Sequence, residues 1–241
     1  MTQEYEKYTE EDFLVWKTLF ERQMEQLPGL ADKAYLNGIA AIDFVADKIP
    51  NFDEMNQKLE SITGWNVTVV KGLIPNKEFF ELLNNCKFPS STWFRKMEQL
   101  DYLEEPDMFH DVYGHVPLLA DQNFCDFLQG LSKIALKHIE NEWAIEILSR
   151  LYWYTVEFGL INTEDGLRIY GAGILSSRGE SVYSLSENPE QVPFDIAEIY
   201  KTPYIKDKFQ EKYFVIDSYK QLYESLPQIE SILEQELLVS E

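Results

Sequence analysis

The stretch Glu105–Pro117 reads Glu-Pro-Asp-Met-Phe-His-Asp-Val-Tyr-Gly-His-Val-Pro and holds two of the chain's three histidines, His110 and His115. Prolines near both ends predict a short helix with rigid limits. On an ideal α-helix, residues five apart point about 140° away from each other, so both rings reach one ion only if the helix ends or unwinds between them. Gly114 offers that break, because glycine readily closes a helix. Two separate buried histidines fit the same spacing, and a shared metal needs a third ligand.

Composition indicates one folded domain. The chain has 241 residues, of which 45% are hydrophobic, and a chain of this length can bury about three quarters of its unfolded surface. The net charge of -21 argues against a nucleic-acid partner. Two cysteines, Cys86 and Cys125, imply no disulfide framework. The N-terminal residues lack the apolar core of a signal peptide, and no apolar run approaches membrane-spanning length, so we expect a cytoplasmic protein without a membrane partner.

Helical periodicity dominates the chain. Apolar residues recur at helical intervals within 9–27, 36–49, 53–63, 76–83, 121–135 and 141–158, with Asn76 and Asp121 as candidate caps. Alternation predicts strands at 65–70 and 213–216, and 162–166 resembles a turn between two short strands. No repeat, low-complexity tract or linker divides the sequence. We therefore expect a mainly α fold with a small β component, in a single domain over residues 1–241.

Three stretches of the sequence together resemble the pterin-dependent aromatic amino acid hydroxylases. They are 105–118, then 152–160 (Tyr-Trp-Tyr-Thr-Val-Glu-Phe-Gly-Leu), then 170–180 (Tyr-Gly-Ala-Gly-Ile-Leu-Ser-Ser-Arg-Gly-Glu). The similarity runs from about Tyr8 to about Tyr223 and is greatest to the short bacterial phenylalanine 4-hydroxylases. It implies a single catalytic domain of that type, with a core at about 8–223 and a short acidic tail at 228–241.

Animal members of that family carry a regulatory domain before the catalytic core and a coiled-coil tail after it. Only about 100 residues precede the two histidines here, and the acidic tail is short. We therefore expect neither a regulatory domain nor tetramer formation, and we expect the protein to act as a monomer.

The resemblance implies that His110, His115 and Glu157 bind Fe(II). Two imidazoles and one carboxylate on one face of an ion form the facial triad of non-heme iron oxygenases, which leaves other positions open. Zinc hydrolases use the same ligand set, so ligand identity alone does not fix the metal. Without the resemblance, Glu157 is one acidic residue among 42.

The activity implied is hydroxylation of L-phenylalanine to L-tyrosine, with a tetrahydropterin and dioxygen as co-substrates. Tryptophan or tyrosine hydroxylation by the same family is an alternative. A metal-dependent hydrolase on the same triad, or a non-catalytic module that binds a pterin or an amino acid, are alternatives from other classes. Val215 resembles a position where tyrosine hydroxylases have an aspartate; a valine leaves a phenolic hydroxyl unpaired, which predicts a preference for phenylalanine.

The same resemblance places the pterin against a strand, turn and helix that follow residue 65. The residues implied are Val70, Gly72, Ile74, Asn76, Phe79 and Asp111. Backbone groups around Gly72 can meet the pyrimidine edge of the pterin, and Phe79 can stack on its ring. Ordinary core packing is the alternative for Phe79, and a solvated helix face is the alternative for Asp111.

The resemblance also implies a site for the amino acid substrate. Its residues are Arg95, Asp107, Trp153, Ser176 and Glu180. Arg95 binds the α-carboxylate with Asp107 holding its guanidinium in place, and Trp153 walls the aromatic ring. Ser176 and Glu180 line the same pocket, and Ser176 can also orient His110.

Overall fold

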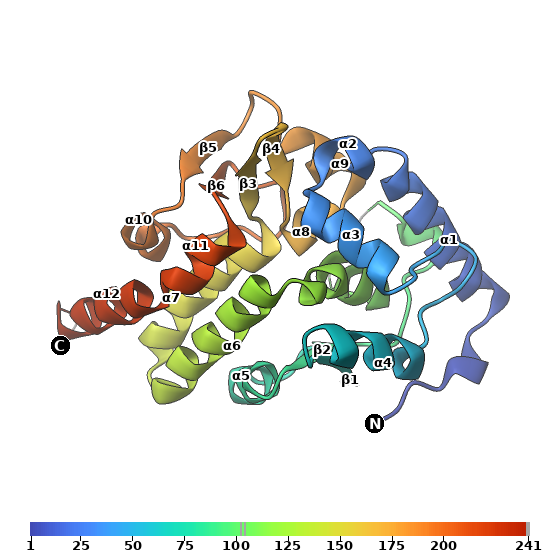
Figure 1. The fold of residues 1–241 in the computed structure, drawn as a ribbon, viewed down its shortest axis with the longest axis horizontal. Coiled ribbons are helices and arrows are strands. Elements are labelled where there is room, and N and C mark those ends of the chain that lie inside the picture. Colours follow the sequence, from blue (N-terminus) through green and yellow to red (C-terminus); the bar gives the residue numbers. More distant parts are fainter. Residues whose placement is uncertain (102, 104, 240–241) are drawn as a thin grey trace.

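The computed structural model describes residues 1–101, 103 and 105–239, which form a mainly helical fold with two small sheets (Figure 1). The α-helices are α1 (Glu10–Met24), α2 (Leu27–Leu30), α3 (Lys33–Ala41), α4 (Phe52–Ile62), α5 (Asn76–Asn84), α6 (Gln122–Lys137), α7 (Glu142–Tyr152), α8 (Ala172–Leu175), α9 (Arg178–Tyr183), α10 (Ile196–Lys201), α11 (Tyr219–Glu224) and α12 (Leu226–Val239). The strands are β1 (Asn66–Val69), β2 (Lys87–Ser90), β3 (Leu160–Thr163), β4 (Gly166–Ile169), β5 (Glu190–Pro193) and β6 (Lys212–Ile216). The predicted fold class is confirmed.

Two segments are π-helical and lie at the centre of the molecule. They are η3 (Phe109–His115) and η5 (Trp153–Glu157), which continues directly from α7. Short 3-10 turns complete the helical part of the described chain: η1 (Tyr5–Lys7), η2 (Met97–Gln99) and η4 (Val116–Ala120). The helix predicted over 141–158 is therefore α-helical only in its first part.

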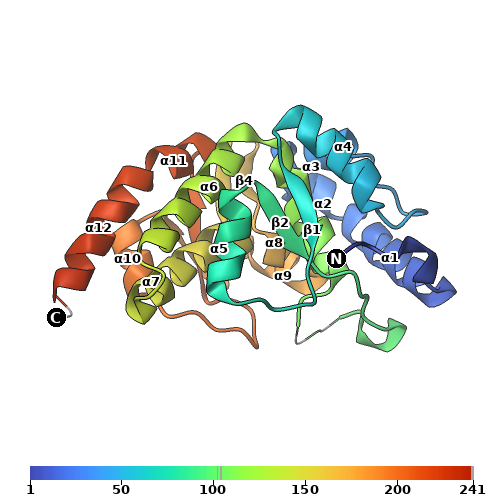
Figure 2. The same cartoon turned by 90° about the horizontal axis from the view of Figure 1, so that it is seen from below.

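The two sheets lie at opposite edges of the helical layer (Figure 1). β1 and β2 pair in parallel, with Val67 opposite Phe88. The larger sheet has the order β4-β3-β6-β5, in which β3 and β4 are antiparallel and the other pairs are parallel. The view from below shows α6 crossing the molecule with α5 on one side and α11 on the other (Figure 2), and α6 contacts both.

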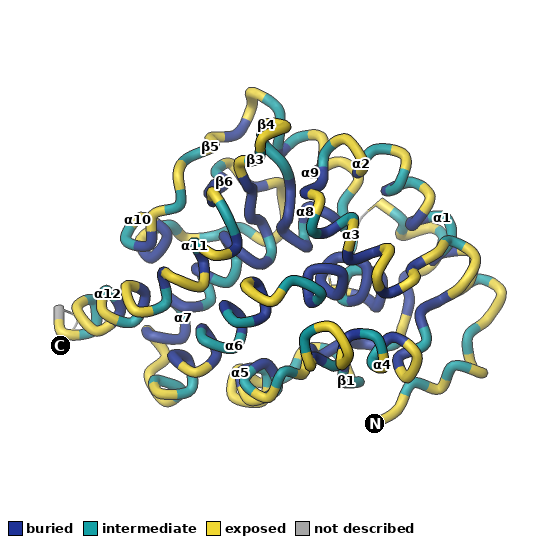
Figure 3. Tube along the Cα trace, viewed as in Figure 1, coloured by how far each residue is buried: buried dark blue, intermediate teal, exposed yellow. Residues whose placement is uncertain are grey.

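The core follows from the apolar stripes of these helices. On α6, Phe124, Phe127, Leu128 and Leu131 are buried, and the Asp121 carboxylate caps the helix by accepting from the Phe124 N–H at 3.0 Å. Figure 3 shows the buried trace running through the middle of the fold, with exposed residues on the outer faces of the peripheral helices. The two π-helical segments belong to this core, since Phe109, Val112 and Tyr113 of η3 and Tyr154 and Val156 of η5 are buried.

One local prediction is wrong, and one segment is more regular than its sequence suggested. Asn76 is the first residue of α5 rather than its cap, because Pro75 precedes the helix and no side chain caps it. The expected tail at 228–241 is part of α12 up to residue 239, and residues 240 and 241 lie outside the described chain. Ile229 and Leu233 of α12 are fully buried, and the Tyr200 hydroxyl donates to the Ile229 carbonyl at 3.0 Å. No helix in the described ranges has both the length and the apolarity needed to span a bilayer.

Candidate metal centre and adjoining cavity

The segment η3 brings His110 and His115 onto one side of the backbone. The predicted break at Gly114 is wrong, because Gly114 has no positive φ and the π-helix continues through His115. Hydrogen bonds in a π-helix run from residue i to i+5, so a residue five positions on lies one turn further along rather than on the far face. The two Nε2 atoms are consequently 3.3 Å apart. Widening of the helix, not its interruption, lets the two rings converge.

Gly114 has a different role, which is to let α8 approach η3. A Cβ atom at this position would lie 2.9 Å from the Ala172 carbonyl oxygen and 3.2 Å from the Ala172 Cβ. Contacts below about 3 Å force the backbone to shift. The absence of a side chain at Gly114 therefore fixes the distance between η3 and α8, whose C-terminal cap is Ser176.

Glu157, at the end of η5, completes a triangle of potential ligands. Its Oε1 lies 3.2 Å from His115 Nε2 and its Oε2 lies 3.6 Å from His110 Nε2. Consider two ligand atoms that each lie about 2.0–2.2 Å from the same ion. They are about 3.0 Å from each other when the angle at the ion is a right angle, and about 3.4 Å when it is tetrahedral. The observed separations suit a single ion, and they fit a facial iron site and a tetrahedral zinc site equally well.

The protonation of His110 and Glu157 suits metal binding at neutral pH. Burial lowers the pKa of His110 to about 4; the neighbouring His115 also lowers it, although Glu157 acts the other way. Burial raises the pKa of Glu157, but attraction to His115 and His110 outweighs this and leaves the pKa below its usual value. Neutral imidazole and ionised carboxylate are the forms that bind a metal.

Ser176 determines which nitrogen of His110 carries the proton. Its hydroxyl donates to the Ala172 carbonyl at 2.8 Å, so the single hydroxyl proton is already used. The Oγ atom, 3.0 Å from His110 Nδ1, must then accept a hydrogen bond from that nitrogen, which therefore carries the proton. His110 Nε2 keeps its lone pair and faces His115 and Glu157, as a metal ligand requires.

A cavity of about 320 Å³ opens beside the triad. All six residues predicted to contact the pterin are in its lining, namely Val70, Gly72, Ile74, Asn76, Phe79 and Asp111. Burial raises the pKa of Asp111 to about 7, although its carboxylate accepts from the Ser91 N–H at 2.8 Å. Asp111 therefore does not lie on a solvated helix face, and its bond to Ser91 joins the end of β2 to η3.

Arg95 and Asp107 form a buried pair that holds the start of η3. Arg95 Nε and Nη2 donate to Asp107 Oδ2 and Oδ1, each at 2.9 Å, and Asp107 is fully buried. Asp107 Oδ1 also accepts from the His110 N–H at 3.1 Å. Neither residue is part of the cavity lining, whereas Trp153 is. The predicted contact between Arg95 and Asp107 is present.

Ser176 and Glu180, which were predicted to line the pocket, are not among the lining residues of the cavity, and Val215 is not among them either. Ser176 lies behind His110, as described above. Glu180 lies deeper, where its Oε1 accepts from the Tyr213 hydroxyl at 2.7 Å and from the Gln210 N–H at 3.2 Å. Val215 is buried in β6, so the selectivity expected from it has no support in the site.

Several cavity residues were not predicted from the sequence. Among them are Tyr152, Ser149, Pro106, Phe88 and Tyr204. Tyr152 directly precedes Trp153 and begins the family-like stretch 152–160, so the sequence could have suggested that it lines the cavity. Tyr204 lies in the irregular segment between α10 and β6, where no periodicity marks it, yet its ring stacks on Trp153 with centroids 4.5 Å apart.

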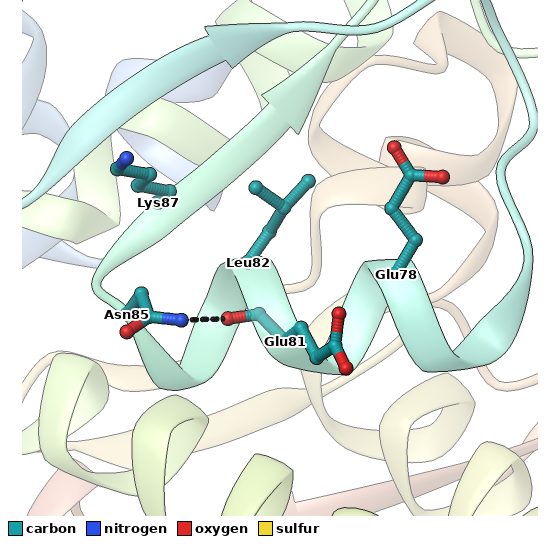
Figure 4. A pocket seen from close by; sticks show the side chains of 5 residues that line it. All are labelled: Glu78, Glu81, Leu82, Asn85 and Lys87. Atoms are coloured by element: carbon teal, nitrogen blue, oxygen red, sulfur yellow. Dashed lines mark hydrogen bonds between the residues drawn. The ribbon is translucent and has the colours of Figure 1, made fainter.

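A second hollow lies against the outer face of α5 (Figure 4). Its lining consists of Glu78, Glu81, Leu82, Asn85 and Lys87. Asn85 Nδ2 donates to the backbone carbonyl of Glu81 at 2.7 Å, which is a contact within the helix end. Among the described residues, the group of three potential metal ligands is the one formed by His110, His115 and Glu157. The candidate site for metal binding and catalysis is therefore the cavity beside the triad, and not the hollow at α5.

Comparison with known proteins agrees with this geometry. The family described as biopterin-dependent aromatic amino acid hydroxylase matches residues 4–240. The phenylalanine-4-hydroxylase of Chromobacterium violaceum is 50% identical over 226 residues, covering 93% of this chain and 76% of that protein. The phenylalanine-4-hydroxylase of Ralstonia nicotianae is 48% identical over 226 residues, covering 93% and 72%.

Solved structures of the Chromobacterium violaceum enzyme have the same fold. One, with bound iron(III) and oxidised 7,8-dihydrobiopterin, superposes with a TM-score of 0.94 at 47% identity, covering 100% of this chain and 87% of that one. Another, with iron and phenylalanine bound, gives a TM-score of 0.93 at 46% identity, covering 99% and 87%. The chain belongs to the biopterin-dependent aromatic amino acid hydroxylase family.

Proposed function

We propose that His110, His115 and Glu157 hold Fe(II) in an enzyme that converts L-phenylalanine to L-tyrosine with a tetrahydropterin and dioxygen. The observation that carries this assignment is the triangle of three ligand atoms, all within 4.8 Å of one another, at the wall of an aromatic cavity. The chain is a phenylalanine 4-monooxygenase, as are relatives that share about half of its sequence. When bound, the iron and the pterin supply the redox chemistry, and the protein positions them and the substrate.

The pterin is proposed to lie on the β1–α5 side of the cavity. Gly72, with φ of 130°, turns the chain there and leaves backbone groups open to the cavity. Phe79 is half-buried and packs edge-on against Tyr152 at 5.4 Å, so one of its faces can stack on a flat ring. Asp111 adds a carboxyl group between this wall and the metal ligands. This arrangement offers both stacking and polar contacts.

Phenylalanine is proposed to place its ring against Trp153 and its α-carboxylate toward Arg95. Trp153 is one of the cavity residues, and it precedes Glu157 on η5, so its indole lies beside the metal site. A guanidinium has five N–H donors, of which Asp107 takes two and the Leu100 carbonyl takes one at 3.3 Å. Two N–H groups remain within the described contacts, one on each Nη, and they form the end-on fork that suits a carboxylate.

The organisation of the protein is part of the same proposal. The chain is proposed to form a single catalytic domain that acts as a monomer in the cytoplasm, without nucleic-acid or membrane partners. Its support is the continuous core from α1 to α12 and the strongly negative charge of -21. Sedimentation of the purified protein at micromolar concentration tests the monomer: a dimer would contradict it.

An omission assay tests the activity. Purified protein is supplied with phenylalanine, Fe(II), tetrahydropterin and oxygen, and tyrosine is measured with each component left out in turn. Tyrosine should form only with all four present. Activity that needs zinc and ignores oxygen would indicate a hydrolase on the same ligands. Faster hydroxylation of tryptophan or tyrosine than of phenylalanine would identify the protein as a tryptophan or tyrosine hydroxylase of the same family.

Three variants test the ligands. His110→Ala, His115→Ala and Glu157→Ala each remove one donor from a three-donor site, so each should abolish both iron binding and tyrosine formation. Iron per chain is measured by atomic spectroscopy after desalting. A variant that keeps stoichiometric iron would exclude its residue from the ligand set, whatever its activity.

A further inference from the structure

The indole of Trp153 is held on three sides. Tyr204 stacks on it with centroids 4.5 Å apart and planes 20° apart, and Phe158 packs against it at 4.6 Å with planes 34° apart. The indole Nε1–H donates to Gln210 Oε1 at 3.0 Å. The two ring contacts limit tilting of the indole, but stacked rings slide easily over one another. The hydrogen bond to Gln210 is the contact that fixes the rotation of the indole within its plane.

Gln210 can make this bond in only one orientation. It is 3% exposed, and its Nε2 donates to the carbonyls of Ile205 at 2.8 Å and Lys208 at 3.3 Å. Both amide protons are thereby used, so Oε1 is the atom directed at the indole N–H. A flipped amide would set an NH₂ group against an N–H and leave two carbonyls without their donor.

The backbone of Gln210 is fixed as well. Its N–H donates to Glu180 Oε1 at 3.2 Å, and the same oxygen accepts from the Tyr213 hydroxyl at 2.7 Å. Glu180 is buried on α9 and Tyr213 is buried on β6, so the carboxylate joins two rigid elements to the end of the segment 202–211. Gln210 thus links Glu180, which does not reach the cavity, to Trp153, which does.

We propose that Gln210 is a positioning residue for the aromatic substrate: it fixes the indole of Trp153 against the substrate ring, and Glu180 acts on the site through Gln210. The inference rests on the proposed function in one respect, the role of Trp153 as the wall for that ring. It also gives Glu180 a defined role, which is to hold Gln210 behind Trp153 without lining the cavity itself. Gln210 also attaches the segment 202–211, which carries Tyr204, to Trp153.

A positioning role and a purely structural role predict different results. Loss of general stability would weaken phenylalanine and pterin binding together. Loss of positioning should weaken phenylalanine binding and leave pterin binding unchanged, because the pterin side of the cavity is lined by the turn after β1, by α5 and by η3, and Gln210 is not among the lining residues. The ratio of the two dissociation constants therefore separates the two roles.

The test compares Gln210→Met with Gln23→Met. Gln23 is a matched control, since it is also a buried glutamine, 2% exposed, whose Nε2 donates to a backbone carbonyl, that of Leu175, at 2.5 Å. Dissociation constants for phenylalanine and for a tetrahydropterin are measured by calorimetry on the iron-loaded protein, with thermal unfolding and iron content as checks. Gln210→Met should raise the phenylalanine constant about threefold to tenfold, because of its three side-chain hydrogen bonds only the one to the indole acts on the substrate wall, and it should leave the pterin constant unchanged. Gln23→Met should change neither constant.

A double-mutant cycle then tests whether the effect passes through the indole. Trp153→Phe removes the N–H donor, so adding Gln210→Met to it should change phenylalanine binding by less than twofold. Tyrosine formed per tetrahydropterin consumed should fall in Gln210→Met, because a misplaced ring is oxidised less often. If Gln210→Met fails to fold, Gln210→Asn, one methylene shorter, replaces it with the same expectation.

The outcomes distinguish this inference from the proposed function. Equal weakening of phenylalanine and pterin binding, no change in either, or full additivity with Trp153→Phe would each overturn the positioning role. Wild-type protein that neither binds phenylalanine nor makes tyrosine would overturn the proposed function itself.

Discussion

At the scale of single residues, Arg95 illustrates how a buried ion pair can leave a binding group available. Asp107 engages the side of the guanidinium and also accepts from the His110 backbone N–H, so the same carboxylate orients the proposed substrate-binding group and a proposed metal ligand. Removing either partner of a buried pair is costly, on the order of 3–5 kcal/mol, because the other charge stays buried. The pair therefore couples the geometry of the substrate site to that of the metal site.

Arg95→Lys should impair the reaction with phenylalanine strongly. A lysine has one compact head group and cannot engage Asp107 and a second carboxylate with parallel donors. We expect kcat/KM for phenylalanine to fall tenfold or more, where each tenfold corresponds to about 1.4 kcal/mol. Iron content should not change. Phenethylamine lacks the α-carboxylate, so its binding should barely respond; equal losses for both compounds would show that Arg95 only supports the fold.

Glu180→Gln should flatten the fall in stability with rising pH. Burial raises the pKa of Glu180, although bonds from Tyr213 and the Gln210 backbone oppose this. Between the unfolded pKa of about 4.5 and the higher folded value, the folded state binds more protons than the unfolded state, so ionisation lowers stability as pH rises. A glutamine oxygen can accept the same two bonds without ionising. Thermal unfolding of both proteins from pH 4.5 to 8 measures the slopes; parallel curves would contradict the shift.

At the scale of elements, the π-helical segments explain both a success and a failure of sequence reasoning. The proposed ligands His110, His115 and Glu157 could be selected from the sequence because their motifs are specific, and the structure brings the three side chains together. The backbone that does so could not be derived, because a spacing of five fits a broken α-helix and a continuous π-helix equally well. The same limit applies to 141–158, where the change from α7 to η5 leaves no mark in the apolar pattern.

Gly114→Ala should disturb η3 through its neighbour α8. The new Cβ would meet the Ala172 carbonyl oxygen at 2.9 Å, so α8 must move and carry Ser176 away from His110. We expect a loss of about 1–3 kcal/mol in unfolding free energy and weaker iron binding. Gly29→Ala is the control, since a Cβ there meets nothing within 4 Å and its φ is not positive. Alanine has a higher helix propensity than glycine, so a loss confined to Gly114→Ala must come from the close approach. Unchanged stability in both variants would contradict the constraint that α8 places on Gly114.

At the scale of the whole molecule, the sequence predicted the class of fold but not how its parts meet. Periodicity located α6 and its Asp121 cap, and alternation located β6. The parallel strand β2 was not predicted, because Lys-Phe-Pro-Ser contains a proline and is too short to alternate clearly. Gln210 could not be found either, since its role depends on contacts with Glu180 and Trp153, which are distant in the chain.

The net charge of -21 has a consequence for stability that can be measured. The chain has 42 acidic and 21 basic side chains, so at least half of the carboxylates lack a lysine or arginine to pair with one to one. Exposed pairs such as Lys33 with Asp165 contribute only about 0–1 kcal/mol each, and salt weakens them. Repulsion among the unpaired carboxylates should outweigh them, so screening should stabilise the fold.

We therefore expect the midpoint of thermal unfolding to rise between 10 mM and 300 mM NaCl at pH 7.5. Over that range the screening length falls from about 30 Å to roughly 6 Å, which removes most long-range repulsion and spares contacts inside the core. KCl should give the same curve, because screening depends on ionic strength and not on a bound ion. The rise should shrink near pH 5, where part of the negative charge is lost. A midpoint that falls with salt would mean that the surface ion pairs, not the excess of carboxylates, dominate the electrostatics of the folded state.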